Sequence, residues 1–296
     1  MAKTAWVFPG QGSQAIGMGA DLLDIPAARA KFAQADRILG WSVPEVCQNP
    51  DDKVSHTLYT QPCLYVVESI LTDLMMEMDR SPAPDLVAGH SLGEYVALYA
   101  AEVFDFETGL RLVQRRATLM DSASDGMMAA LIGFDRAELE QCILNTPDVV
   151  LANDNSAAQV VISGTPAAVE TVLAQVKAKR AVKLNVSGAF HSPLMAAAAI
   201  EFQSVLAEVN FNPARVPVLS NVEPQPTTDP ALLKDRLARQ MTGSVRWREI
   251  SLGLPEAGIE TVVEIGPGKV LTGLVKRTCP NLTLQNVSSV ADLPAG

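Results

Sequence analysis

Residues 86–93 read Leu86-Val87-Ala88-Gly89-His90-Ser91-Leu92-Gly93 and lead into a segment rich in Ala, Leu and Tyr. An apolar run without alternation predicts a strand that is covered on both faces, and the segment after it predicts a helix. Glycines two residues before and after Ser91 allow the tight turn of a nucleophile elbow, which lifts a serine hydroxyl above the sheet. The alternative is a serine that only caps the helix. The strand-turn-helix context favours a nucleophile.

Strands and helices alternate on both sides of this turn. The alternation predicts an α/β fold built on a parallel sheet. The expected strands are 5–8, 86–89, 216–220 and 261–264, and the expected helices are 27–39, 63–78, 93–101, 106–123, 193–209, 230–240 and 270–276.

A different order occupies the middle of the chain. Strands 127–132, 149–153, 159–163 and 182–186 and helices 136–144 and 166–178 follow one another as βαββαβ, the ferredoxin-like arrangement. Asp135 and Thr165 stand where N-caps of the two helices are expected. We therefore expect a large hydrolase-like α/β unit from residues 1–125 and 190–296, and an inserted small subdomain from residues 126–189.

Composition excludes several classes of protein. The 296 residues are 48% hydrophobic and 19% charged, which excludes disorder as the main state. Thirty-three acidic and twenty-three basic residues give a net charge of −10, which argues against nucleic acid or an anionic membrane as the main partner. No leader-like or membrane-spanning apolar stretch is found, which predicts a cytoplasmic protein. Four widely spaced cysteines indicate reduced thiols and neither zinc nor disulfides: Cys47, Cys63, Cys142 and Cys279.

A serine nucleophile needs a base, and the sequence offers three histidines. His90 adjoins Ser91, so its side chain should point away from the serine, and His56 lies in a polar loop without a motif. His191 lies where the small subdomain ends and a helix begins, a place where clefts form. We predict His191 as the base, the alternative being a histidine that merely precedes a helix.

The loop after the first strand reads Pro9-Gly10-Gln11-Gly12-Ser13-Gln14. Glycines on both sides of Gln11 would let its main-chain N–H face a substrate. A tetrahedral acyl intermediate needs two such donors, and Leu92, just after the nucleophile, offers the other. A phosphate cradle is the alternative, but neither G-x-G-x-x-G nor a Walker lysine is present.

Together these segments resemble the malonyl-CoA:acyl-carrier-protein transacylases of fatty acid synthesis and the related acyltransferase domains of polyketide synthases. The resemblance spans essentially the whole chain and implies a hydrolase-like core with an inserted ferredoxin-like subdomain. It rests on five motifs in order: Phe8 to Gln14, Gly89 to Tyr95, Gln114-Arg115-Arg116, Gly188-Ala189-Phe190-His191-Ser192 and Glu264 to Leu271.

The resemblance implies a role for each matching residue. Ser91 is the nucleophile, His191 its base, and the main-chain N–H groups of Gln11 and Leu92 stabilise the oxyanion. Arg116 anchors the free malonyl carboxylate, a task that suits a planar bidentate guanidinium. Taken without the resemblance, Arg116 would be assigned to a solvated helix face.

Two further residues are expected to bind substrate. Phe190 occupies a position that is typically Phe where malonyl is used and Ser where methylmalonyl is used, although core packing would also explain it. Gln240 matches a family glutamine near the active site, and Gly243-Ser244 replaces the Asn-Pro of several members. The family orients its histidine with main-chain carbonyl groups, so no catalytic Asp or Glu is expected.

The implied reaction is a two-step transfer without a metal or organic cofactor, in which CoA and phosphopantetheine thioesters are substrates. Ser91 takes malonyl from malonyl-CoA, and the phosphopantetheine thiol of acyl carrier protein then takes it from Ser91 for fatty acid elongation. The carrier is acidic across the family. The candidate docking residues, which could equally be a solvated helix end, are Lys177, Lys179, Arg180 and Lys183.

Other functions remain open at this point. A polyketide acyltransferase acting in trans would use the same residues. A serine esterase or thioesterase typically places its base near the C-terminus, whereas more than a hundred residues follow His191. A scaffold that keeps the fold without turnover would be indicated by the loss of Ser91, His191 or Arg116, and all three are present.

Overall fold

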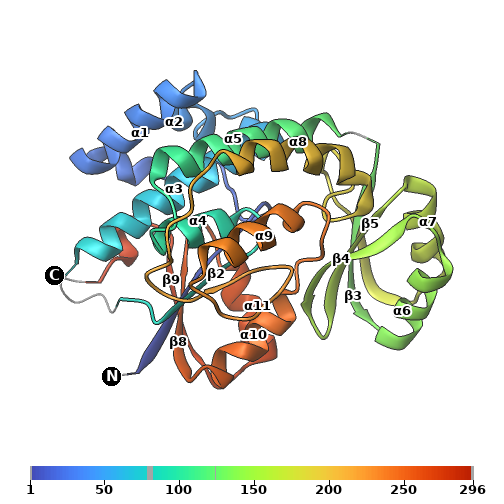
Figure 1. Cartoon of the computed structure of the whole chain (residues 1–296). Coiled ribbons are helices and arrows are strands. Elements are labelled where there is room, and N and C mark those ends of the chain that lie inside the picture. Colours follow the sequence, from blue (N-terminus) through green and yellow to red (C-terminus); the bar gives the residue numbers. More distant parts are fainter. Residues whose placement is uncertain (1, 79–82, 124, 295–296) are drawn as a thin grey trace.

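The computed structural model describes residues 2–78, 83–123 and 125–294, and its largest element is a five-stranded sheet (Figure 1). Every strand in it is parallel to its neighbours, in the order β7-β2-β1-β8-β9. The α/β class with a parallel sheet is therefore confirmed. The strands are β1 Lys3–Phe8, β2 Leu86–Gly89, β7 Val218–Leu219, β8 Ile259–Ile265 and β9 Thr283–Val287.

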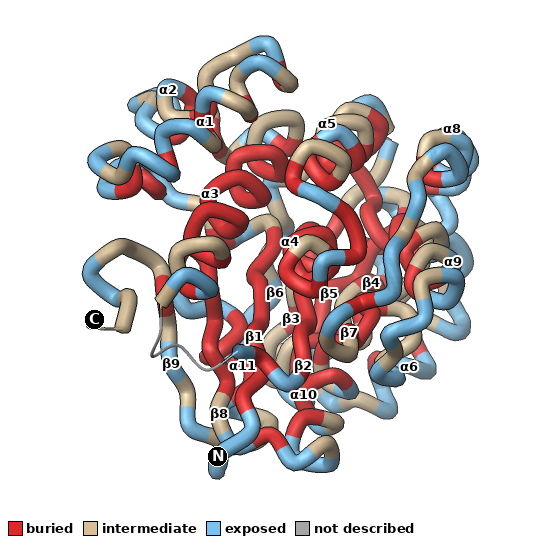
Figure 2. Tube along the Cα trace, turned by 60° about the vertical axis from the view of Figure 1, so that its left-hand side comes forward, coloured by how far each residue is buried: buried red, intermediate tan, exposed pale blue. Residues whose placement is uncertain are grey.

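Helices cover both faces of this sheet because its central strands are apolar on both sides. Trp6 and Phe8 belong to the core cluster that includes α3, α4 and α5, while Ala5 and Val7 pack in the cluster that includes α10 and α11. Figure 2 shows β1 and β2 buried along most of their length. The helices are α1 Pro26–Leu39, α2 Val43–Cys47, α3 Thr57–Glu77, α4 Gly93–Ala100, α5 Phe106–Ser122, α8 Ala196–Ala207, α9 Pro230–Gln240, α10 Trp247–Glu256 and α11 Val270–Thr278.

A second, antiparallel sheet follows α5 and lies on the right in Figure 1. Its strands lie in the order β4-β5-β3-β6. With two helices on one face, this is the strand order of a ferredoxin-like unit. The predicted boundaries of the small subdomain, residues 126 and 189, stay a prediction. Residues 1, 79–82, 124 and 295–296 of the predicted large unit lie outside the described residues. The elements are β3 Met127–Phe134, α6 Arg136–Asn145, β4 Val149–Ser156, β5 Gln159–Gly164, α7 Pro166–Gln175 and β6 Ala178–Lys183.

The last strand of the small sheet differs from the expected one. The predictions of a strand at 182–186 and of a helix to residue 178 are wrong, because α7 ends at Gln175 and β6 runs over Ala178–Lys183. Among the strands that the structure describes, this one pairs with β3 alone, and it is largely exposed. Edge strands often carry charged side chains, so the sequence of β6 lacked the apolar signal of a strand. The basic cluster therefore lies on a strand edge, not at a helix end.

Other differences from the sequence prediction are local. Residues Pro193–Met195 form a separate 3-10 turn before α8, and β7 is only two residues long. The helices α2 and α10 and the strand β9 were not expected. α2 and β9 have five residues each, so their apolar patterns are too brief to stand out from the sequence around them. The sequence of α10 contains Gly253 and Pro255, residues that disfavour a helix.

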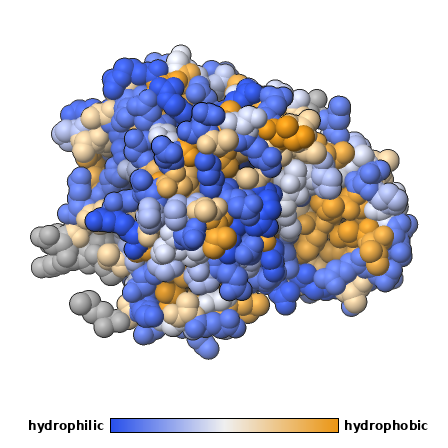
Figure 3. All heavy atoms as spheres, in the orientation of Figure 1, coloured by the Kyte–Doolittle hydropathy of each residue, from blue (hydrophilic) through white to orange (hydrophobic). Residues whose placement is uncertain are grey.

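Charged side chains lie mainly outside the core. The face in Figure 3 is largely hydrophilic over the large unit, with an apolar area at the right over the small sheet. No helix within the described ranges is long and apolar enough to cross a membrane. Buried exceptions include Arg116, Glu94 and Glu68.

Glu68 lies in the buried part of α3. Both of its carboxylate oxygens are buried and have no hydrogen-bond partner among the described residues. Glu264 of β8, in contrast, accepts hydrogen bonds from the main-chain N–H groups of Leu271 and Thr272. Burial, with a smaller contribution from repulsion by Glu264, raises the pKa of Glu68 well above its usual range.

We expect Glu68→Gln to become progressively more stabilising as the pH rises. Between the ordinary carboxyl pKa and the raised one, the folded state holds a proton that the unfolded state has released. The free energy of unfolding should therefore fall by up to about 1.4 kcal/mol per pH unit at this site. Glutamine cannot ionise, so the variant lacks this slope. Denaturant unfolding of both proteins at a series of pH values checks it, and parallel pH profiles would contradict it.

Candidate active site

Ser91 lies on a strained turn between β2 and α4. Its φ of 54° is in the left-handed region. A Cβ on Gly89 would lie 1.9 Å from the main-chain carbon of Gly93, and one on Gly93 would lie 2.0 Å from the carbonyl oxygen of Phe8. Both glycines are therefore required by close backbone approach. The Ser91 hydroxyl makes no cap bond to α4, whose N-cap residue is Leu92. The turn has the geometry of a nucleophile elbow.

His191 faces the serine. The Ser91 Oγ lies 2.8 Å from His191 Nε2, and His191 Nδ1 lies 2.9 Å from the carbonyl oxygen of Gln240 and 3.2 Å from that of Gly243. Because carbonyl oxygens only accept hydrogen bonds, Nδ1 must carry the proton. Nε2 is then free to accept the serine proton. The main-chain carbonyl groups take the place of a triad carboxylate.

The charge state of His191 suits a general base. Its side chain is buried at 3% exposure. Burial, helped by the nearby Arg116 guanidinium, lowers the pKa of His191 to about 3. The imidazole is therefore neutral at physiological pH, as acceptance of a proton requires.

Arg116 reaches the same hydroxyl from α5. Its Nη2 lies 3.0 Å from Ser91 Oγ and 3.0 Å from Gln240 Oε1, and its Nη1 lies 2.6 Å from Gln61 Oε1. The residue is 1% exposed, so a solvated helix face is excluded. No ion pair within the described part of the chain includes Arg116, and burial lowers its pKa. A buried cation without an ion pair is costly, and an anionic ligand would offset that cost.

Gln240 connects Ser91, Arg116 and His191 by hydrogen bonds. Its side-chain Nε2 donates to the carbonyl oxygen of Ser91 (2.9 Å) and to Glu94 Oε2 (2.7 Å), while its Oε1 accepts from Arg116. Its main-chain oxygen orients His191. Gln240 does not line the cavity at Ser91. Its contacts are those of a positioning residue, whereas the sequence predicted a substrate contact.

Sequence reasoning missed two amides that hold the site together. Asn221 Oδ1 accepts from the Ser91 main-chain N–H (2.7 Å) and its Nδ2 donates to the Gly89 carbonyl oxygen (2.6 Å), so it spans the elbow. Gln61 supports Arg116. Asn221 follows the carboxyl end of β7, the neighbour of β2, where α/β proteins place ligand groups. Gln61 is a polar residue in the mostly apolar sequence of α3. These two signals could have identified both residues.

The two predicted oxyanion donors lie together beside Ser91. Within the described chain, the main-chain N–H groups of Gln11 and Leu92 have no hydrogen-bond acceptor, and both residues line the cavity at Ser91. A Cβ on Gly10 would lie 2.3 Å from the His90 carbonyl oxygen, so the loop after β1 packs directly against the elbow. Two free donors next to a serine hydroxyl are what an acyl-transfer intermediate requires.

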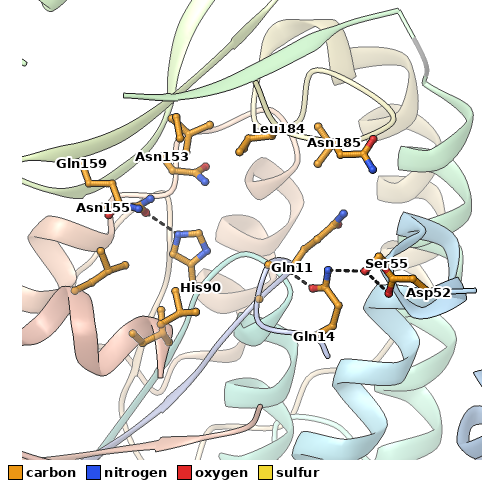
Figure 4. A pocket seen from close by; sticks show the side chains of 18 residues that line it. Gln11, Gln14, Asp52, Ser55, His90, Asn153, Asn155, Gln159, Leu184 and Asn185 are labelled. Atoms are coloured by element: carbon orange, nitrogen blue, oxygen red, sulfur yellow. Dashed lines mark hydrogen bonds between the residues drawn. The ribbon is translucent and has the colours of Figure 1, made fainter. Parts of the chain in front are cut away.

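The cavity at Ser91 and a larger one that adjoins it form a passage between the small sheet and loops of the large unit. A cavity of about 70 Å³ contains Ser91, Arg116, Phe190 and His191 in its lining. It shares His90 and other residues with an adjoining cavity of about 400 Å³. Figure 4 shows small-sheet residues on one side of this larger cavity and loop residues of the large unit on the other. A long, thin substrate fits such a passage.

The sequence prediction that His90 points away from the nucleophile agrees with its contacts. His90 Nε2 lies 2.9 Å from Asn155 Oδ1 of β4 (Figure 4). Its ring centroid lies 5.7 Å from that of Trp247. His90 therefore connects the elbow to the small sheet. The third histidine, His56, is the N-cap residue of α3 and lines neither of these two cavities.

Comparison with known proteins covers nearly the whole chain. Residues 5–294 match the family model described as acyl transferase domain. The chain is 60% identical over 291 residues to the malonyl CoA-acyl carrier protein transacylase of Synechocystis, covering 98% of this chain and 99% of that one.

Solved structures agree. The crystal structure of the Synechocystis sp. PCC 6803 malonyl-CoA:ACP transacylase superposes with a TM-score of 0.96 at 59% identity, covering 98% of each chain. A malonyl-transacylase in complex with its type II polyketide synthase acyl-carrier protein gives a TM-score of 0.92 at 37% identity, covering 98% of this chain and 97% of that one.

Proposed function

The chain belongs to the acyl transferase family, and from that premise we propose that it is a malonyl-CoA:acyl-carrier-protein transacylase. The observation that carries the proposal is the Arg116 guanidinium, which is buried, has no ion pair with any residue that the structure describes, and lies 3.0 Å from Ser91 Oγ. A substrate with a free carboxylate beside its thioester would supply the missing anion. Malonyl thioesters have this structure, and acetyl thioesters do not.

In the first half-reaction, His191 Nε2 accepts the hydroxyl proton while Ser91 Oγ attacks the thioester carbonyl carbon of malonyl-CoA. The N–H groups of Gln11 and Leu92 donate to the oxyanion. The carbon–sulfur bond then breaks, and CoA leaves with the proton from His191. Malonyl-Ser91 remains, held at its carboxylate by Arg116.

The second half-reaction repeats these steps with a new thiol. His191 accepts the proton of the phosphopantetheine thiol on acyl carrier protein, and the sulfur attacks the malonyl-Ser91 ester. Collapse of the intermediate returns the proton to Ser91 and releases malonyl carrier protein. We propose that both steps proceed without a metal or organic cofactor, since every proton moves between His191, Ser91 and the thiols.

Intact mass spectrometry tests the proposal directly. After mixing with malonyl-CoA, the protein should gain the mass of one malonyl group on Ser91. After addition of holo acyl carrier protein, that mass should move to the carrier. A serine esterase or thioesterase would release free malonate and leave the carrier unlabelled, which would reject the transferase.

We propose fatty acid elongation as the pathway, supported by the 60% identity to the Synechocystis transacylase. The similarity to a malonyl-transacylase in complex with a type II polyketide synthase carrier favours a second candidate, a polyketide acyltransferase acting in trans. The two differ only in the carrier that is served. Relative kcat/KM with fatty acid and polyketide carriers distinguishes them.

We further propose that the basic cluster contacts the acidic carrier in the cytoplasm. Lys177, Lys179 and Arg180 are exposed on or beside the edge strand β6, whereas Lys183 pairs with Glu170 of α7 at 2.7 Å. An exposed cationic edge suits an acidic partner. The location is supported by the cysteines, all four of which are free thiols.

Phe190 is expected to exclude substrates with an extra methyl group. Its ring is 5% exposed and lines the small cavity together with Ser91 and Arg116. One methyl group changes discrimination in an apolar pocket by about 1 to 3 kcal/mol. Phe190→Ser should therefore shift relative kcat/KM toward methylmalonyl-CoA by roughly ten- to a hundredfold.

Competition between malonyl-CoA and methylmalonyl-CoA, with the acyl groups on Ser91 counted by mass, measures this shift. Phe190→Leu is the matched control, since it retains apolar bulk and should change the ratio much less. An unaltered ratio in Phe190→Ser would assign the ring to core packing alone.

A further inference from the structure

The register of the small sheet places Arg180 on the face that lines the passage. Directly opposed residues of antiparallel strands project to the same face. Arg180 of β6 pairs with Ile132 of β3, and Ile132 pairs with Gln159 of β5, which lines the cavity of about 400 Å³. Lys183, an odd number of residues away, projects to the opposite face, where it pairs with Glu170. Only part of the basic cluster therefore faces the passage.

A second guanidinium, from the large unit, contacts the row of paired residues formed by Arg180, Ile132 and Gln159. Arg277, in the last turn of α11, donates from Nη1 to Gln159 Oε1 at 3.1 Å. One turn earlier, Leu274 lines the cavity. With neighbouring strands about 4.8 Å apart, the Cα atoms of Arg180 and Gln159 lie roughly 10 Å apart. Arg277 thus contacts Gln159, and Arg180 lies two strands away in the same row of paired residues.

Both guanidinium groups are available to an anion. Arg180 and Arg277 are exposed, and neither takes part in an ion pair with any other described residue. The entrance of the passage is the outer part of the larger cavity, between this row and Asp52 (Figure 4). Its Asp52 side is acidic. An adjoining cavity of about 340 Å³, which shares Asp52 with the first, is lined by Asp51, Asp52 and Asp121. An anionic group at the entrance is therefore repelled on one side and attracted on the other.

The distance from the active site agrees with the length of the pantetheine arm. Met128 lines the small cavity at Ser91, and Ile132 lies four residues further out on the same strand, about 13 Å away. About thirteen bonds separate the sulfur and phosphorus atoms of phosphopantetheine. At the extension of a polypeptide, in which three bonds span about 3.3–3.6 Å, they reach about 14–16 Å. A phosphate would arrive at the row that contains Ile132.

We propose that Arg180 and Arg277 form a phosphate site at the entrance, which holds the phosphate at the outer end of the pantetheine arm. The proposal rests on the proposed function, because that function supplies the arm. In malonyl-CoA this phosphate is joined to the nucleotide, and in the holo carrier it is joined to a serine of the protein. One site therefore serves both substrates and sets the depth to which the thioester enters.

A series of thioesters tests the site with the double variant Arg180→Ala, Arg277→Ala. Malonyl-pantetheine lacks the phosphate, malonyl-phosphopantetheine has it, and malonyl-CoA adds the nucleotide. The variant should raise KM about tenfold for the two phosphorylated thioesters, the scale of two exposed charge pairs. KM for malonyl-pantetheine and kcat for all three should not change. Arg111→Ala is the matched control, because this exposed arginine of α5 pairs with Glu107 and lines neither cavity, and it should leave all values unchanged.

Two outcomes with the thioesters would overturn the site. The first is an equal rise in KM for malonyl-pantetheine, and the second is no rise for malonyl-phosphopantetheine. A rise for malonyl-CoA alone would assign the arginines to the nucleotide. An unchanged KM for the holo carrier as acceptor would overturn the carrier half of the proposal. Failure of the proposed function is distinguishable, because the wild-type protein would then transfer no malonyl group from any of the three thioesters to the holo carrier.

Discussion

Ser91→Ala is expected to abolish the malonyl-enzyme adduct and to reduce transfer by about 10⁴- to 10⁶-fold. The turn presents one hydroxyl to the end of the passage, with a base at 2.8 Å and a guanidinium at 3.0 Å. Alanine removes the nucleophile and leaves the base, the oxyanion donors and the cavity in place. Intact mass after mixing with malonyl-CoA measures the adduct directly.

His191→Ala should cost nearly as much, because nucleophile and base act as one unit. Combining it with Ser91→Ala should add little to either single effect. Unchanged circular dichroism of the variants separates lost chemistry from lost fold. A malonyl group that persists on any residue other than Ser91, located by peptide mapping, would reject the assignment of the nucleophile.

The sequence predicted the elements of the fold well where the local signal was strong. Leu86–Gly89 and Pro230–Gln240 match β2 and α9 to the residue, since one is an unbroken apolar run and the other begins with Asp229 and a proline. The predicted bounds of β6 were wrong because pairing with β3, and not apolar character, holds this strand in the sheet. Strand pairing is a long-range property that no local pattern contains.

The candidate site shows the same contrast between residues that local patterns identify and residues that only long-range packing brings together. The glycines around Ser91 and the scarcity of histidines identify the nucleophile and the base, because each chemistry restricts the residue types that can supply it. Gln240 could be identified only through resemblance, and its contacts with Arg116, His191 and Glu94 join segments far apart in the chain. Such contacts depend on how the segments pack, which the sequence does not express locally.

Arg116→Ala is expected to remove malonyl transfer while keeping acetyl transfer. The substrate carboxylate would then be buried without its cation, at a cost of about 2 to 5 kcal/mol, or roughly 30- to 5,000-fold in kcat/KM. Acetyl has no charge to leave unpaired, and the space freed by the guanidinium does not impede it. Rates with malonyl-CoA and acetyl-CoA, measured on the same preparations, give the two factors.

Arg115→Ala is the matched control for this prediction. Arg115 precedes Arg116 in α5 but is exposed and pairs with Glu201 at 2.7 Å, so its loss should change neither rate appreciably. Arg116→Lys should recover only part of the malonyl activity, since an ammonium keeps the charge but not the planar pair of donors. If malonyl and acetyl rates fell by the same factor in Arg116→Ala, the guanidinium would act by holding Ser91, Gln61 and Gln240 in place. A selective loss of malonyl transfer instead means that substrate choice resides in one buried cation, because the remaining groups at Ser91 serve any acyl thioester.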